Sequence, residues 1–426
     1  MPNVLILSHS DIVGGAARAA FRLHSALLKY GIISTMEVAL KKTDLGSVEG
    51  PSNKFGKAIS ELRSLLGTAI TKLQKTKNPV IHSSSFLPSG LIKKIHDNPT
   101  NLVHFHWVGN EYLSIWDIAR IRKAKVWTLH DMWPFCGAEH YAPDSATTRW
   151  RHGYTKYNRP EGHGGLDIDR WTWNRKRRAW TRPMHIVTPS SWLANCVRDS
   201  ALMSDWPVTV IPNPLDTRQF QPWPKDLARD VLNLPLSAPL VLFGAIGGGR
   251  DPRKGWDLLQ MALKQVAKEQ PDVQGIIFGQ SEPVDLPKIG LPLHWLGHLH
   301  DDATLALLYS AVDVTVTPSR QENLPQTGTE AQSCGCPVVA FNCTGLPDVV
   351  EHGVTGYLAQ PYEPDDLAKG ICWVLEDSER HTQLSAAARE RAVRLWSPKV
   401  VVPQYLRVYQ AAIDEWSTTT KNKTKT

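Results

Sequence analysis

Short apolar runs alternate with amphipathic segments along most of the chain. Runs typical of buried strands are VLILSH, LVHFHW, KVWTLH and HIVTPS in the first half, and PLVLFGA, VQGIIFG, LHWLG, VDVTVTPS and PVVAF in the second. Between them, apolar positions recur at helical spacing, as in Ala16–Tyr30 and Trp256–Glu269. Strands that are apolar on both faces and alternate with helices are typical of parallel sheets covered on both sides. The pattern therefore predicts an α/β protein with two Rossmann-like domains.

A proline-rich stretch separates the two series. The segment VTVIPNPLDTRQFQPWPKD contains four prolines, which interrupt regular structure and predict a linker. The length of 426 residues also fits two domains of roughly 150 to 200 residues each. We expect a first domain over residues 1–211, a second over 212–390, and a helical segment over 391–416 that returns to the first domain. The polar tail STTTKNKTKT, residues 417–426, predicts disorder.

Composition narrows the class of protein further. With 42% hydrophobic and 21% charged residues the chain is typical of globular proteins, and no apolar run approaches the ~18 residues that span a bilayer. The opening run VLIL is far shorter than the apolar core of a secretory signal. The six cysteines are scattered, which favours free thiols in a reducing cytosol. A net charge of +7 indicates an anionic partner.

Ligands of such sheets bind beyond the carboxyl ends of the strands, so the loops there are the candidate sites. Gly14 and Gly15 allow a ligand to approach the backbone ahead of a helix, although a plain tight turn explains them equally well. His130 and Asp131 directly follow the strand KVWTL, where a structural histidine is about as common as a functional one. His104 and His106 share one side of a strand, which favours packing over a metal site because no third ligand can be placed.

Two later loops carry the charges that a nucleotide ligand needs. In FGAIGGGRDPRKGWDLL, three glycines precede Arg250, Arg253 and Lys254 at the start of a helix, an arrangement suited to a diphosphate. The alternative is a solvated basic turn; a P-loop is excluded because no serine or threonine follows Lys254.

The second loop is ENLPQTGTEAQSCGCPVVAF. Pro325 suits the first turn of a helix that we expect to run to about Ser333 and to end at Gly335 and Pro337. Glu322 lies ahead of this helix and Glu330 lies within it, so the two carboxylates can bracket one ligand. Carboxylates bind neutral hydroxyls well, while the helix N-terminus between them can face an anion.

The order of these motifs resembles the retaining glycosyltransferases of family 4, which have the GT-B fold. The resemblance covers the glycine loop, His130, the IPNPLDTRQF linker, the Arg/Lys-Gly segment and Glu322-x7-Glu330 followed by GCPVVAF. It implies two Rossmann-like domains facing each other across a cleft, with an acceptor bound mainly by the first domain and a nucleotide-sugar donor mainly by the second. ENLPQTGTEAQSCGCPVVAF is similar to the bacterial polysaccharide branch of the family.

The resemblance also implies roles for single residues. Glu330 would bind the ribose hydroxyls, Glu322 would lie near the hydroxyls of the donor sugar, and Lys254 with Arg250 or Arg253 would bind the diphosphate. The remaining candidates are His130 beside the donor sugar; Gly14, Gly15, Pro325, Gln326 and Thr327 around the donor; and Asp131 and His106 on the acceptor side. The family's usual Glu-Gly-Phe-Gly is Glu322-Asn323-Leu324-Pro325 here, so the sugar contact is expected to differ in detail.

The expected reaction is transfer of a hexose from a UDP- or GDP-linked sugar, used as a co-substrate, to a glycan or lipid-linked acceptor in surface polysaccharide synthesis. We expect no metal or other cofactor, because protein cations neutralise the departing diphosphate. A metal-binding alternative is the Asp-x-Asp pair Asp167 and Asp169, which has no strand before it. A non-catalytic nucleotide-sugar-binding protein and a nucleic-acid-binding protein remain as other classes, the latter suggested by RWRHGYTKYNR and RWTWNRKRRAW.

Two segments are candidates for peripheral contact with the inner face of a cell membrane. The first is residues 171–180, where three tryptophans accompany the cations Arg175–Arg178. The second is residues 54–77, where an apolar stripe is flanked by lysines. For this second segment we favour a helix that turns its apolar stripe toward the protein core.

Overall fold

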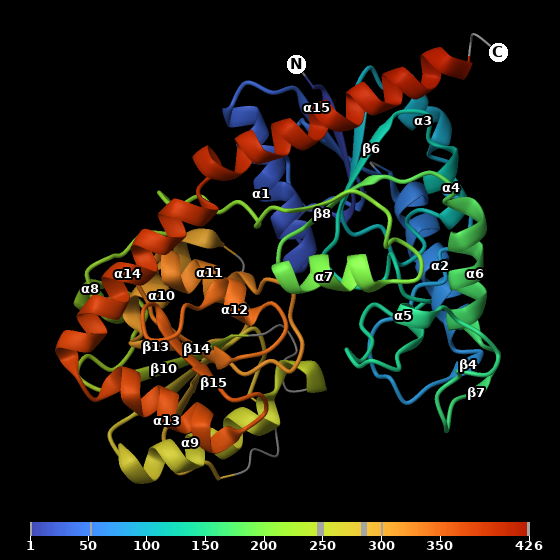
Figure 1. Cartoon of the computed structure of the whole chain (residues 1–426). Helices are drawn as coiled ribbons and strands as arrows, with labels where there is room; N and C mark the ends of the chain where they lie inside the picture. Colours follow the sequence, from blue (N-terminus) through green and yellow to red (C-terminus); the bar gives the residue numbers. More distant parts are fainter. Residues whose placement is uncertain (1, 52, 245–250, 283–287, 300, 424–426) are drawn as a thin grey trace. The chain divides into compact units, whose positions relative to one another are not determined.

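The computed structural model describes residues 2–51, 53–244, 251–282, 288–299 and 301–423, with side chains as far as residue 420. The chain divides into two compact units, which we describe separately. The N-terminal unit contains Met1–Asn213 and Val402–Thr426, and the C-terminal unit contains Pro214–Val401. Both units are α/β structures built on parallel sheets (Figure 1).

The N-terminal unit is built on a seven-stranded sheet in the order β3-β2-β1-β5-β6-β8-β9, in which every neighbouring pair is parallel. Its strands are β1 (Val4–Ser10), β2 (Ser34–Leu40), β3 (Val48–Glu49), β5 (Leu102–Phe105), β6 (Ala124–Thr128), β8 (His185–Thr188) and β9 (Val208–Val210). Its helices before the linker are α1 (Gly15–Lys29), α2 (Lys54–Thr71), α3 (Ile92–Asp97), α4 (Ile115–Arg120), α5 (Arg149–His152), α6 (Ile168–Ala179) and α7 (Ser191–Asp199). A small antiparallel pair, β4 (Gln74–Lys75) with β7 (Gly164–Gly165), lies outside the main sheet.

The C-terminal unit is built on a six-stranded parallel sheet in the order β12-β11-β10-β13-β14-β15. Its strands are β10 (Leu240–Gly244), β11 (Gln274–Phe278), β12 (Leu293–Trp295), β13 (Val314–Thr317), β14 (Val338–Phe341) and β15 (Gly356–Ala359). Its helices are α8 (Lys225–Val231), the short 3₁₀ helix η1 (Pro252–Lys254), α9 (Trp256–Glu269), α10 (Asp302–Ala311), α11 (Gln326–Ser333), α12 (Leu346–Val349), α13 (Pro364–Leu375) and α14 (Ser378–Trp396).

The hydrophobic pattern predicts this architecture well. Each of the nine apolar runs overlaps a strand, and each of the two main sheets has its own buried hydrophobic cluster. The expected helix at Trp256–Glu269 matches α9, and the one at Ala16–Tyr30 lies within one residue of α1. Strands β2, β9 and β15 are not among the predicted runs; β2, for example, has the mixed sequence STMEVAL. Each of these three strands nevertheless pairs in parallel with a predicted strand.

The C-terminal helix α15 (Pro398–Lys423) begins in the C-terminal unit, and its residues from Val402 onward belong to the N-terminal unit. The buried side chains of Tyr405 and Tyr409 connect it to the N-terminal sheet, where they contact His104. The helix extends to Lys423, whereas the polar composition from residue 417 predicts disorder. Threonine hydroxyls at 418 and 419 donate back to backbone carbonyls four residues earlier, within the helix.

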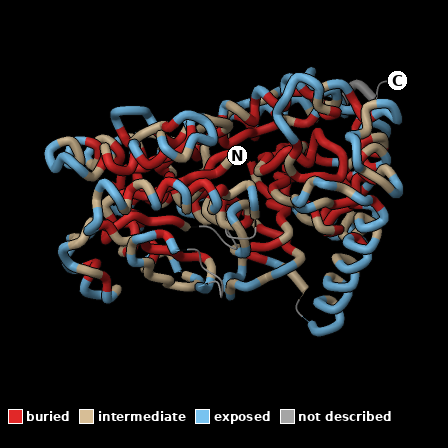
Figure 2. Tube along the Cα trace, turned by 90° about the horizontal axis from the view of Figure 1, so that it is seen from below, coloured by how far each residue is buried: buried red, intermediate tan, exposed pale blue. Residues whose placement is uncertain are grey.

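Helix α2 does not turn its apolar stripe toward the core, so that prediction is wrong. Phe55, Leu62 and Leu66 of this stripe are 75%, 56% and 45% exposed, and Gly67 is the helix's buried residue. Along the chain as a whole, buried segments lie inside and exposed segments lie at the surface (Figure 2). The inner face is small and polar instead. Arg63 donates to the carbonyl oxygens of residues 87, 88 and 111, and a Cβ on Gly67 would lie 2.4 Å from the Glu111 side chain. The close approach at Gly67 fixes which face of α2 packs inward.

Candidate functional site

The candidate donor residues of the C-terminal unit lie after the carboxyl ends of β10 and β13. In the described part of the first loop, Lys254 ends the helix η1, and its ammonium group forms an ion pair with Glu322 Oε1 from the loop after β13. The glycines 247–249 and Arg250 lie outside the described residues. Arg253 pairs with Asp251 Oδ2 at 2.7 Å and also donates to the Gln321 carbonyl at 3.3 Å. The basic loop that contains Lys254 is therefore in contact with Glu322.

Gly255 explains why these two loops can lie so close together. It has a φ of +68°, in the left-handed region, and a Cβ at this position would lie 1.9 Å from the Pro318 carbonyl oxygen. Two residues after Pro318, the Arg320 amide donates to the Arg253 carbonyl at 2.7 Å. Backbone packing, rather than the ion pair alone, holds Lys254 beside Glu322.

Glu322 is held on several sides and is only 7% exposed. Its amide donates to Thr344 Oγ1 at 3.1 Å, its carbonyl accepts from the Gly345 amide at 3.0 Å, and Ser319 Oγ donates to Oε1 at 3.3 Å. Burial acts to raise the pKa of this carboxyl, but the charges of Lys254 and Arg253 outweigh burial and leave the pKa below its ordinary value. Glu322 is therefore ionised at neutral pH.

The helix that follows has the predicted limits. Helix α11 runs from Gln326 to Ser333 with Pro325 as its N-cap residue, and Gly335 follows in the left-handed region with a φ of +76°. Gln326 and Thr327 are partly exposed in its first turn. Glu330 is 3% exposed and accepts a hydrogen bond from the Tyr309 hydroxyl at 3.0 Å. Both glutamates are thus buried acceptors, one ahead of the helix and one within it.

In the N-terminal unit, Asp131 is the centre of a hydrogen-bonded network at the carboxyl end of β6. Its Oδ2 accepts from Trp107 Nε1 at 2.8 Å and lies 2.6 Å from His140 Nδ1, while Oδ1 accepts from the Trp133 amide at 3.0 Å. Burial acts to raise the pKa of Asp131, but His140 and these hydrogen bonds outweigh it and lower the pKa. The network fixes a negative charge at this edge of the sheet.

His106 and His130 form a neutral imidazole pair beside Asp131. His106 Nδ1 lies 2.9 Å from His130 Nε2, and the rings are stacked with centroids 5.1 Å apart. Burial lowers the pKa of His130 to about 4, and burial with the nearby imidazoles lowers that of His106 well below its ordinary value. Within the described chain, His106 Nε2 is buried and has no hydrogen-bond partner. The two candidate histidines are therefore brought together, uncharged at neutral pH.

Three neighbours of this network were not identified from the sequence. His9 follows the apolar part of β1, and its ring packs edge-on against Trp107 with centroids 5.4 Å apart. His140 lies far along the loop between β6 and α5 and does not directly follow a strand, so no pattern in the sequence marks it. Asn110 contacts His9 Nε2 at 3.3 Å. His9 lies at the carboxyl end of β1 and Trp107 follows β5, a signal that the sequence did contain.

Gly14 is the N-cap of α1 in the same unit. Its φ is +91°, a conformation that residues with a Cβ rarely adopt, and no heavy atom lies within 4 Å of where a Cβ would stand. Gly15 is the first residue of the helix. The requirement for glycine here comes from the backbone conformation, and the open space beside Gly14 leaves its peptide accessible.

The Asp-x-Asp pair has structural partners. Asp167 caps α6 through the Arg170 amide and forms an ion pair with Arg149 at 2.7 Å, while buried Asp169 accepts from Gln74 Nε2 at 2.5 Å. Across the described ranges, no cluster of three or more His, Cys, Asp or Glu side chains is arranged to bind a metal ion.

The segment 171–180 is largely buried, which is incompatible with its prediction as a membrane contact. Trp173 and Trp180 lie in the hydrophobic cluster, and Lys176 is fully buried, donating to the carbonyl oxygens of residues 133, 136 and 137. Arg175 donates to the carbonyls of residues 84 and 85. Packing and hydrogen bonding inside the unit therefore explain most of this basic and aromatic stretch. In the described part of the chain, no helix combines the length and apolar character needed to cross a membrane.

Comparison with known proteins agrees with this architecture. The family model described as "Glycosyltransferase Family 4" matches residues 13–219, and the model described as "Glycosyl transferases group 1" matches residues 230–391. Sucrose-phosphate synthase from Thermosynechococcus elongatus is 20% identical with a TM-score of 0.67, covering 97% of this chain and 100% of that chain. Anabaena HepE in complex with UDP and glucose is 19% identical with a TM-score of 0.65, covering 96% and 100% respectively. The two parallel-sheet units therefore form a GT-B fold.

Curated relatives match part of the chain more closely. A D-inositol 3-phosphate glycosyltransferase of Thermobispora bispora is 31% identical over 223 residues, 49% of this chain and 51% of that protein. A second, from Catenulispora acidiphila, is 34% identical over 217 residues, 47% of this chain and 50% of that protein. The chain thus spans about half the length of the curated relatives it matches. Together with the family models, these matches show that the chain belongs to glycosyltransferase family 4.

Proposed function

We propose that this protein is a retaining, metal-independent glycosyltransferase that moves a hexose from a UDP- or GDP-linked sugar to a hydroxyl group of a glycan or lipid-linked acceptor in surface polysaccharide synthesis. The observation that carries the proposal is the ion pair between Lys254 and Glu322 beside the start of α11. Family membership and the UDP-glucose complex of Anabaena HepE support a nucleotide-sugar donor. The acceptor class rests on the likeness of ENLPQTGTEAQSCGCPVVAF to the bacterial polysaccharide branch.

In the proposed reaction, the bond between the anomeric carbon and the diphosphate breaks as negative charge builds on the departing group. The ammonium of Lys254, with Arg253 or Arg250, neutralises that charge, and the amides of the first turn of α11 add their partial positive charge. Glu322 then accepts from hydroxyl groups of the sugar in place of Lys254. Glu330 accepts from the ribose hydroxyls.

The acceptor hydroxyl attacks the anomeric carbon on the face from which the diphosphate leaves, which retains the configuration. Its proton passes to the departing diphosphate oxygen, so no protein nucleophile is needed. Neutral His130 and His106 can exchange hydrogen bonds with sugar hydroxyls without adding charge. Asp131 positions Trp107 on the acceptor side.

A panel of UDP- and GDP-sugars tests the proposal directly. We expect one donor to raise the melting temperature and to be hydrolysed slowly, with added EDTA having no effect. A protein that is stabilised by a donor but releases no sugar would instead be a non-catalytic binding protein. Activity lost with EDTA and restored by manganese would contradict metal independence.

We further propose that the protein acts at the cytoplasmic face of a membrane by peripheral contact, and that the contact is helix α2. Its exposed face presents Phe55, Leu62 and Leu65 beside the exposed lysines Lys54 and Lys57. Apolar side chains flanked by cations are suited to the headgroup layer of an anionic bilayer. This contact would bring a lipid-linked acceptor to the enzyme.

A further inference from the structure

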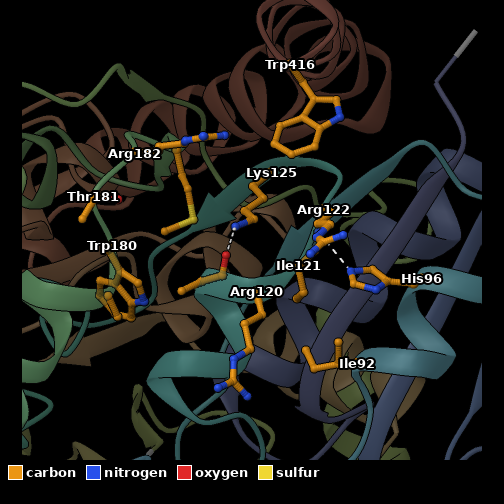
Figure 3. A pocket seen from close by; sticks show the side chains of 13 residues that line it. Ile92, His96, Arg120, Ile121, Arg122, Lys125, Trp180, Thr181, Arg182 and Trp416 are labelled. Atoms are coloured by element: carbon orange, nitrogen blue, oxygen red, sulfur yellow. Dashed lines mark hydrogen bonds between the residues drawn. The ribbon is translucent and has the colours of Figure 1, made fainter. Parts of the chain in front are cut away.

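A hollow of about 600 Å³ lies in the N-terminal unit (Figure 3). Its walls come from α3, from the end of α4 with the turn into β6, from the turn between α6 and β8, and from α15. These turns lie at the amino ends of β6 and β8, whereas His130 follows the carboxyl end of β6. At ~3.3 Å per strand residue, β6 separates the hollow from the candidate site by about 15 Å.

The charges around this hollow have one sign. Arg120, Arg122, Lys125 and Arg182 line it, and no aspartate or glutamate is among the lining residues that the structure describes. Within the same described residues none of these four side chains forms an ion pair, in contrast to Arg149, which pairs with Asp167. A concave surface with several unpaired cations attracts anions more strongly than the same charges spread over a convex surface.

Lys125 reaches the hollow from β6 and is held at its wall by backbone carbonyls. Its ammonium donates to the carbonyl oxygens of Ile118 at 2.8 Å and Ala119 at 3.2 Å, which leaves one of its three protons for a ligand. Burial, and then the charge of Arg182, lower the pKa of Lys125 to about 8. An anion in the hollow would relieve the repulsion between these two cations.

Apart from Thr181, the remaining lining is apolar or aromatic. Trp180 and Trp416 come from different segments, and Met184 and Ile121 also line the hollow. His96 Nε2 accepts from the Arg122 amide at 3.1 Å, which leaves its other ring nitrogen, Nδ1, to carry a proton and to donate (Figure 3). The volume is within the ~300 to 1,000 Å³ of small-molecule sites. The chemistry suits an anion that carries an organic body.

We propose that this hollow is a binding site for a phosphate-bearing ligand. Lys125, Arg122 and Arg182 hold the phosphate, and the organic part of the ligand lies against Trp180 and Trp416. The proposal is independent of sugar transfer, because none of these residues belongs to the candidate transferase site. The phosphate can belong to a soluble compound or to a lipid headgroup, and both present the same group to the cations.

The test uses the full chain carrying Lys254→Ala, so that diphosphate binding at the candidate donor loop is weakened. Inorganic pyrophosphate is titrated by calorimetry, and vesicles of phosphatidylcholine with phosphatidic acid are tested by co-sedimentation. Arg122→Ser with Arg182→Ser is compared with the matched pair Arg177→Ser with Arg178→Ser, which removes two exposed arginines outside the hollow.

We expect the double variant at Arg122 and Arg182 to bind at least one probe about tenfold more weakly, because each lost cation removes a charge-assisted hydrogen bond. The control double variant should bind both probes as the parent protein does. Loss of pyrophosphate binding identifies a soluble ligand, and loss of vesicle binding alone identifies a lipid headgroup. If neither probe binds, or if both pairs weaken binding equally, the proposal is wrong. All four arginines are exposed, so equal melting temperatures are expected.

Discussion

Lys254 and Glu322, 68 residues apart in the chain, form an ion pair at the carboxyl edge of the C-terminal sheet. The Lys254 ammonium lowers the pKa of the Glu322 carboxyl and keeps it ionised, and the carboxylate holds the ammonium in the loop. A donor diphosphate would replace Glu322 as the partner of Lys254. Under the proposed function, the pair would be a resting arrangement from which both groups turn to the substrate.

Lys254→Ala should lower turnover of the donor found in the sugar panel by ~100-fold, because loss of one preorganised charge costs about 3 kcal/mol in the transition state. Steady-state kinetics with that donor measure the effect. The matched control is Lys264→Ala, which removes an exposed lysine from α9 and should leave turnover unchanged. Turnover within a few-fold of the unaltered protein would remove Lys254 from the proposed mechanism.

Glu330→Ala should weaken binding of the free nucleotide by roughly 10- to 100-fold, since hydrogen bonds to a charged acceptor contribute ~1.5 to 3 kcal/mol each. Calorimetric titration with UDP and GDP measures this affinity. Because Glu330 also accepts from Tyr309, Tyr309→Phe serves as the control for loss of that internal hydrogen bond. If the two variants lose affinity equally, or if neither loses any, the ribose role is wrong.

Gly255→Ala should destabilise the C-terminal unit much more than Gly353→Ala. Both glycines have positive φ, +68° and +76°, but a Cβ at 255 would lie 1.9 Å from the Pro318 carbonyl, whereas a Cβ at 353 has nothing within 4 Å. Backbone strain alone costs about 1 to 2 kcal/mol, so the difference between the variants reports the close approach of the two loops. Urea denaturation measures both; equal losses would show that the loops can separate freely.

The sequence predicted the two main sheets and the limits of α11 because both depend on local patterns. Runs apolar on both faces mark the central strands, and Pro325 with Gly335 marks the ends of α11. The orientation of α2 could not be predicted in this way, since periodicity shows a stripe but not the side to which it turns. That side depends on the contact between Gly67 and Glu111, which only the tertiary structure brings together. The same holds for Lys176, whose burial depends on carbonyl groups about 40 residues earlier in the chain.

The fully buried His104 should make the protein less stable as the pH falls. Its nitrogens contact Tyr409 Oη at 2.9 Å and Thr128 Oγ1 at 2.8 Å, and burial lowers its pKa to about 3. The unfolded chain takes up a proton below about pH 6.5 and the folded chain does not, so the free energy of unfolding falls between these two pKa values.

The expected contribution of His104 is ~1.4 kcal/mol for each pH unit within that window. Urea denaturation from about pH 7 to about pH 5 should therefore show a smaller slope for His104→Gln than for the unaltered protein. The control His152→Gln changes an exposed histidine and should keep the original slope. An unchanged slope in His104→Gln would mean that this imidazole is protonated in the folded protein.

The last prediction concerns the proposed membrane contact. Leu62→Ser with Leu65→Ser should abolish most co-sedimentation with anionic vesicles without lowering the melting temperature, because both side chains are exposed and fully burying a leucine contributes ~1.5 to 3 kcal/mol. The matched control is Leu227→Ser with Leu236→Ser, two leucines of the C-terminal unit that are 47% and 62% exposed. The vesicle binding that the variant at Leu62 and Leu65 retains should weaken as salt is added, because salt screens the attraction between the lysines of α2 and the anionic lipids. Equal binding by both double variants, or no binding of the unaltered protein to anionic vesicles at low salt, would show that α2 is not the membrane contact.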